Sequence, residues 1–165
     1  MKSLALTLSG FLITVLAPAA PAGGEDENAA VLRKLEGTWD LERPGHKPSD
    51  IAQNGDVWWT FESGLLVITC HDGQTEQFRC TPVVNARANP MWLDLRYPRG
   101  ETVVLGICKL EGDRLIYVPG KHVKAEDYAR AKGELPGRPS SFTPAKGDED
   151  RKQVLLRNKN SGGSR

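Results

Sequence analysis

Histidine and cysteine are two residue types that could act as nucleophiles, general bases or metal ligands. The 165-residue sequence contains three of each: His46, His71, His122, Cys70, Cys80 and Cys108. None of them falls in a His-x-His, Cys-x-x-Cys or His-Glu-x-x-His spacing, so the sequence predicts no metal site. Cys70 and His71 are adjacent, but neighbouring residues of a strand point to opposite faces, which argues against a Cys–His pair. We therefore predict a protein that is not an enzyme and needs no cofactor.

The N-terminus has the pattern of a secretory signal peptide: Lys2, an apolar run over 4–17 and then small residues. Cleavage after Ala22 fits the A-x-A rule and is preferred to the earlier match that ends at Ala19. The alternative is an uncleaved membrane anchor, but the run of 14 residues is shorter than the ~20 that a spanning helix needs. We expect an exported protein, periplasmic or extracellular, without stable membrane insertion after cleavage. Its expected parts are a signal peptide (1–22), a linker (23–30), one domain (31–158) and a flexible tail (159–165).

The charges of the mature chain balance. The whole sequence has 22 Lys and Arg against 21 Asp and Glu, and removal of the signal peptide also removes Lys2. Nucleic acid and anionic membrane surfaces both require clustered positive charge. We therefore expect neither as a partner. The remaining length is that of one domain.

Short segments of alternating polar and apolar residues dominate the rest of the chain. A helix is expected first, because acids begin the segment 25–35, basic residues end it and Gly37 follows as a stop. A second short helix is expected over 123–132, and 43–55, 82–90 and the rest of 119–149 are expected as connections. Strands are expected over 38–42, 57–61, 65–70, 75–81, 91–97, 102–110, 114–118 and 152–157. About eight strands in succession predict an all-β fold, an up-and-down antiparallel β-barrel.

Turn chemistry fixes the register of the first hairpin. A Ser63-Gly64 turn places Phe61 opposite Leu66 and Trp59 opposite Ile68.

The next loop is expected to have an odd number of residues, 72–74, because only then does Phe78 share the face of Ile68. Cys70 and Cys80 would then lie about four residues apart along neighbouring strands, roughly 13 Å. A disulfide needs Cα atoms within ~7 Å, so this pair is not expected to form one.

The inward-facing residues are the candidate ligand-binding site. They are Trp59, Phe61, Phe78, Leu93, Tyr97, Cys108 and Tyr117. An eight-stranded barrel allows them either to fill a solid core or to line a cavity for a small apolar molecule. Their bulk favours a filled or narrow interior. On the outer face, Trp58 and Trp92 either cover one another, pack against a loop or mark a protein-binding patch.

Several segments together resemble a known family. They are Leu35-Glu-Gly-Thr-Trp39, Trp59-Thr-Phe61, Pro90-Met-Trp-Leu-Asp-Leu95, Gly106-Ile-Cys-Lys-Leu-Glu-Gly-Asp-Arg-Leu115, Arg138-Pro-Ser-Ser-Phe142 and Val154-Leu-Leu-Arg157. Over about 31–158 the chain resembles a lipocalin-like family of small exported bacterial proteins, known chiefly from planctomycetes, with no assigned activity.

The resemblance implies a barrel closed at one end by Trp39, with Arg157 packed over its ring in a cation–π contact worth ~0.5–2 kcal/mol. Two features depart from the family pattern. Cys108 stands where an aromatic residue is expected, which could enlarge the interior, and the stretch 120–137 is longer than usual.

Two functions follow as hypotheses. The first is a protein-interaction or structural module of the cell envelope that uses its outer surface and the insert at 120–140. The alternative is a carrier that holds a small apolar ligand inside the barrel. A contiguous apolar cavity of a few hundred Å³, open at one end, would favour the carrier. An exposed tryptophan patch over a packed interior would favour the interaction module.

Overall fold

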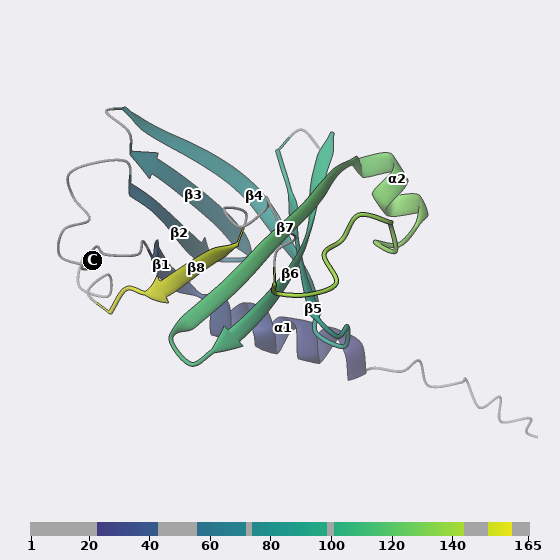
Figure 1. The fold of residues 1–165 in the computed structure, drawn as a ribbon, viewed down its shortest axis with the longest axis horizontal. Coiled ribbons are helices and arrows are strands. Elements are labelled where there is room, and N and C mark those ends of the chain that lie inside the picture. The colour runs from purple at the N-terminus through teal and green to yellow at the C-terminus, as the bar shows by residue number, and fades with distance from the viewer. Residues whose placement is uncertain (1–22, 43–55, 72–73, 99–100, 144–151, 160–165) are drawn as a thin grey trace, which may run out of the picture.

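The chain forms a closed antiparallel barrel in the computed structural model, which describes residues 23–42, 56–71, 74–98, 101–143 and 152–159. The expected connection at 43–55 lies outside these residues. Each strand pairs with the next along the chain, and β8 returns to pair with β1 (Figure 1). The predicted up-and-down barrel is thereby confirmed. Its strands are β1 (Gly37–Leu41), β2 (Asp56–Glu62), β3 (Leu65–His71), β4 (Thr75–Asn85), β5 (Met91–Arg96), β6 (Thr102–Glu111), β7 (Arg114–Lys124) and β8 (Gln153–Arg157), and its helices are α1 (Gly23–Leu35) and α2 (Ala125–Arg130).

Helix α1 lies across one end of the barrel (Figure 1). It begins at Gly23, so the whole of the predicted linker, 23–30, is helical. Leu35 is fully buried, and Val31 and Leu32 pack partly buried against the same core. This apolar face is the reason that α1 docks, because a helix this short gains most of its stability from packing. Neither helix in the described part of the chain is long and apolar enough to cross a membrane.

The predicted registers of β2, β3 and β4 are correct. Phe61 pairs with Leu66 and Trp59 pairs with Ile68. His71 pairs with Thr75, which leaves three residues between them and confirms the odd-numbered loop.

Two strands run further than predicted. β4 continues through 82–85, which was expected as a connection, and Val84 pairs there with the fully buried Leu93. β7 continues to Lys124, so the predicted helix 123–132 shortens to α2. In both places apolar side chains pack against a neighbouring strand, and that burial outweighs the local preference of Pro82 and of the helix formers.

The connections alternate between the two ends of the barrel. The β2–β3 turn, the β4–β5 loop and the β6–β7 turn lie at the end that α1 covers, here called the α1 end. At the opposite end, here called the far end, β7 ends and α2 follows it. The main core fills the space between them and contains Trp39, Trp59, Leu93, Leu115 and Tyr117 among others. A second, smaller cluster of Val103, Leu105 and Tyr128 lies outside the barrel wall, under the segment around α2.

Candidate functional site

The first and last strands meet at Trp39 and Arg157, which are paired across β1 and β8. The Arg157 guanidinium lies 4.2 Å from the centre of the Trp39 ring, so the predicted cation–π contact is confirmed. The pair also binds the end of α1. The Trp39 indole N–H donates to the Leu35 carbonyl at 2.7 Å, and Arg157 donates to the carbonyls of Glu36, at 2.6 Å, and Lys34. These carbonyls would otherwise lack partners at the helix C-terminus.

Gly37 allows the close approach of Arg157 to this helix end. Its φ is +110°, in the region that side chains rarely adopt, and an added Cβ would lie 3.2 Å from Arg157 Nη1. We expect Gly37→Ala to lower the free energy of unfolding by about 1–3 kcal/mol through backbone strain, and by more than Gly64→Ala because its Cβ also displaces Arg157 Nη1. Urea denaturation would measure the loss. Gly64→Ala is the matched control, because that glycine also has positive φ (+78°) but no atom within 4 Å of the added Cβ. Equal losses in the two variants would contradict a role for the Arg157 contact.

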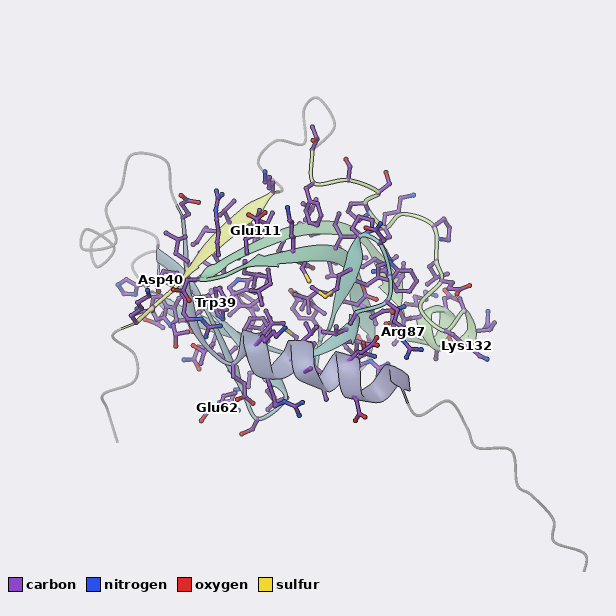
Figure 2. The ribbon with its side chains drawn as sticks, turned by 90° about the horizontal axis from the view of Figure 1, so that it is seen from below. Trp39, Asp40, Glu62, Arg87, Glu111 and Lys132 are labelled. Atoms are coloured by element: carbon purple, nitrogen blue, oxygen red, sulfur yellow. The ribbon has the colours of Figure 1, made fainter. Side chains whose placement is uncertain are left out.

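The N-terminal half of α1 is attached separately. Asn28 Oδ1 accepts the backbone N–H of Ala86 at 2.9 Å. Glu27 pairs with Arg87 at 2.9 Å, with both side chains about half exposed, and such surface pairs contribute little. Figure 2 shows Trp39 near one end of α1 and Arg87 near the other. The helix is therefore held at both ends, more firmly at its C-terminus.

A cleft of about 590 Å³ lies beside α1, between these two attachments. It exists because β6 is longer than its neighbour: β5 begins at Met91, opposite Cys108, and β6 continues past that point to Glu111. Cys108 is the only fully buried residue of the lining and forms its inner end. We call this space the α1 cleft; it is lined by Val31, Lys34, Ala88, Asn89, Pro90, Met91, Cys108, Lys109, Leu110 and Phe142.

The predicted interior residues come together, with one exception. Trp59, Phe61, Leu93, Cys108 and Tyr117 are all at most 4% exposed, and Tyr97 packs partly buried against them. Phe78 is the exception, since it is 43% exposed. It shares the face of Ile68, as predicted, but lies towards the far end, where the core does not cover it.

Aromatic rings pack the middle of the barrel. The ring centre of Trp59 lies 5.1 Å from that of Tyr117 in an edge-on arrangement and 6.1 Å from that of Phe61. Such tilted pairs contribute beyond their buried area. Of the predicted interior residues, only Cys108 also lines the α1 cleft. The other lining residues were not predicted, because the cleft depends on where β5 begins relative to the end of β6.

Asp94 is buried on the outer face of the barrel, at 1% exposure. The alternation of β5 places it outward, but the segment after α2 covers it. Its Oδ2 accepts the Tyr128 hydroxyl at 3.0 Å and Arg138 Nη2 at 2.8 Å, and its Oδ1 accepts the Gly106 N–H at 2.9 Å and Arg138 Nη1. Every oxygen of this carboxylate therefore has two donors.

Arg138 completes this outer cluster. It donates to the carbonyls of Gly106 at 2.8 Å and Gly133 at 3.0 Å, and its guanidinium lies 4.0 Å from the centre of the Trp92 ring. Of the two outward tryptophans, Trp92 is thus covered by a loop residue. Sequence reasoning did not find this pair, because Asp94 and Arg138 lie 44 residues apart along the chain.

The cysteines are not arranged for chemistry. None of the three forms a disulfide, and the register places Cys70 and Cys80 four residues apart, as predicted. Burial raises the pKa of Cys80 to about 12, and burial together with the Asp94 carboxylate raises the pKa of Cys108 to about 12. Both thiols are therefore neutral at physiological pH and unreactive.

The arrangement offers an open cleft beside α1. No group of three or more His, Cys, Asp or Glu that could hold a metal ion occurs among the residues described. His71 Nδ1 lies 3.0 Å from Thr75 Oγ1, in an exposed position at the far end. Comparisons of the chain with protein-family models, with curated proteins and with solved structures find no match.

Proposed function

We propose that the protein binds a small, mostly apolar molecule in the α1 cleft. The observation that carries this proposal is the cleft itself: about 590 Å³, with seven apolar lining residues and three polar ones, Lys34, Asn89 and Lys109. Its inner end is Cys108, a residue of the barrel core. Ligand sites typically have volumes of ~300–1,000 Å³ and largely apolar linings.

The energetics allow moderate affinity. A ligand that buries ~300 Å² of apolar surface gains roughly 7 kcal/mol at ~25 cal/mol per Å², part of which is lost in immobilising the ligand. Dissociation constants in the micromolar to millimolar range are therefore expected. Export, which the sequence of residues 1–22 predicts, would place this binding protein in the periplasm or outside the cell. Fractionation of the native host would test that location.

A substitution at Cys108 tests the cleft directly. Cys108→Phe should place a ring at the inner end of the cleft and lower the affinity for apolar ligands at least 10-fold, because the ring takes the space of the ligand. Displacement of a fluorescent apolar probe measures the affinity. Cys70→Phe is the matched control, because Cys70 is half-buried towards the far end and does not line the cleft.

The two variants distinguish loss of ligand binding in the α1 cleft from a general loss of folded structure. Cys70→Phe should keep the thermal midpoint of the wild type to within a few degrees. Cys108→Phe enlarges a fully buried core residue and should lower the free energy of unfolding by about 1–3 kcal/mol, so affinities are compared at a temperature at which circular dichroism shows both variants to be folded. Unchanged affinity in Cys108→Phe, or an equal loss in Cys70→Phe, would show that the ligand binds elsewhere. Native mass spectrometry of protein from its own host would then identify any small mass that co-purifies.

Protein interaction is the second candidate function. A second hollow of about 500 Å³ lies on the insert, and its lining combines apolar with basic side chains: His122, Val123, Lys124, Asp127, Arg130, Ala131, Leu135 and Pro136. Cross-linking in the native host, with Leu135→Asp as the disrupting variant, would test this surface. A partner captured by the wild type and lost in that variant would favour the interaction module.

A further inference from the structure

A separate hollow of about 290 Å³ lies on the outer face of the barrel, over β4 and β5. Asn28 contributes to its lining from α1, and Tyr128 and Lys132 contribute from α2 and the residues after it. It shares no lining residue with the α1 cleft. We call it the outer hollow; it is lined by Asn28, Val83, Val84, Asn85, Arg87, Trp92, Asp94, Tyr128 and Lys132.

Paired residues of β4 and β5 form the floor of the outer hollow. Val83 pairs with Asp94. Asn85 pairs with Trp92 in the same way, and residues paired across antiparallel strands point to the same face of the sheet. Trp92 is only half-buried under Arg138 and lines the hollow, so part of the indole is accessible. A flat ring can pack against this floor, because ring contacts add to the gain from buried area.

The charge of the outer hollow is positive. Asp94 is the only acid of the lining, and Arg138 supplies its opposite charge. Arg87 pairs with Glu27. Lys132 has no carboxylate within ion-pair distance in the described part of the chain; Figure 2 shows it on the same side of the molecule as Arg87. One positive charge beyond the two pairs matches a ligand with a single negative charge.

Two side-chain amides add hydrogen-bond donors to this lining. Asn28 Oδ1 accepts the Ala86 N–H at 2.9 Å, and Asn85 Oδ1 accepts the Arg87 N–H at 3.2 Å. These bonds leave the NH2 group of each amide to serve a ligand. Ammonium and amide N–H groups can only donate, so their complement is a group that accepts without donating, such as a carboxylate.

The backbone of Lys132 is an independent indication that its side chain has a use. Its φ is +51°, in the left-handed region that glycine and asparagine adopt more readily. The chain turns there after α2: the Lys132 N–H donates to the Ala129 carbonyl at 3.3 Å, and the Gly133 N–H donates to the Tyr128 carbonyl at 3.0 Å. Asparagine would suit this backbone better but would remove the charge. An unfavourable backbone conformation at a residue that lines a hollow points to a function of that residue.

We propose that the outer hollow binds a small aromatic carboxylate. The ring lies against Val83 and Trp92. The carboxylate is held by the Lys132 ammonium group and accepts hydrogen bonds from the NH2 groups of Asn28 and Asn85. The volume is at the lower end of the ~300–1,000 Å³ range of ligand sites, so a single ring suits it better than a larger molecule.

The test is a titration with benzoate, followed through the NMR signal of the Trp92 indole N–H. Benzamide is the neutral probe of nearly the same shape, and acetate carries the charge without the ring. The wild type should bind benzoate about 3- to 10-fold more tightly than either, the worth of one partly exposed charged contact with its hydrogen bond. Equal affinities for benzoate and benzamide, or a Trp92 signal that does not shift, would overturn the proposal. Acetate binding as tight as that of benzoate would overturn the aromatic class.

Lys132→Asn removes the charge and also relieves the backbone. It should abolish the preference for benzoate over benzamide, while its thermal midpoint should equal or exceed that of the wild type. Lys152→Asn is the matched control, because Lys152 is exposed and lines neither the outer hollow nor the α1 cleft; it should keep the preference. A preference retained in Lys132→Asn, or lost only together with stability, would overturn the role of Lys132 in binding. These outcomes leave the proposal for the α1 cleft intact, because the two sites share no residue.

Discussion

Arg138→Met is expected to lower the free energy of unfolding by about 3–5 kcal/mol, the usual cost of removing one partner from a buried ion pair. The substitution leaves the Asp94 carboxylate, at 1% exposure, without its cation. Methionine keeps an unbranched apolar stem beside Trp92, so the loss reports on charge and hydrogen bonding more than on packing. Urea denaturation followed by tryptophan fluorescence would measure it.

Two further variants give this expectation its control. Arg130 also pairs with an aspartate, Asp127, but the Arg130 side chain is 77% exposed, so Arg130→Met should cost less than about 1 kcal/mol. The double variant Asp94→Asn/Arg138→Met should recover at least about 1 kcal/mol relative to Arg138→Met, because no charge is then left buried. If Arg138→Met cost no more than Arg130→Met, the outer cluster would not hold the insert in solution.

A loss of this size would be large for the whole domain. Domains of this length are usually stable by about 5–15 kcal/mol, and the outer cluster joins segments far apart in the sequence. Asp94 lies on β5, Gly106 on β6, and Arg138 beyond α2. Removal of Arg138 should therefore also increase hydrogen exchange at the Gly106 amide, which donates to Asp94.

The parts of the fold that depend on local pattern could be predicted from the sequence. Alternation along β2 and β3, with a Ser63-Gly64 turn between them, determines which residues pair, and Phe61 does lie opposite Leu66. The same parity argument required three residues between His71 and Thr75, and the structure has three. Side-chain period and loop parity are properties of a few neighbouring residues, so they need no knowledge of the tertiary structure.

The parts of the structure that depend on which segment covers a face of the barrel could not be predicted from the sequence. Alternation assigns Asp94 to the outside of the barrel but does not indicate that Arg138, 44 residues later, covers it. Phe78 has the correct parity for the interior, yet it lies where the core ends. The α1 cleft depends on the offset between β5 and β6, which no local pattern encodes.

The second large effect is expected where β1 and β8 meet, at Arg157. Arg157→Ala should lower the free energy of unfolding by about 2–4 kcal/mol. Its hydrogen bonds to the carbonyls of Glu36 and Lys34 are charge-assisted and worth roughly 1.5–3 kcal/mol. The contact with the Trp39 ring adds ~0.5–2 kcal/mol. The Asp113 pair adds little, because Asp113 is 53% exposed.

Arg157→Lys separates charge from geometry at the same position. Lysine keeps the positive charge but lacks the planar fork that reaches two carbonyls and stacks on an indole ring, so it should retain less than half of the effect. Lys159→Ala is the control, since Lys159 pairs with the same Asp113 at 2.9 Å and is 77% exposed; it should cost less than about 1 kcal/mol. Equal midpoints of urea unfolding for Arg157→Ala and Lys159→Ala would mean that Arg157 does not hold α1. In that case the helix wall of the cleft would depend on Leu35 and the N-terminal contacts alone.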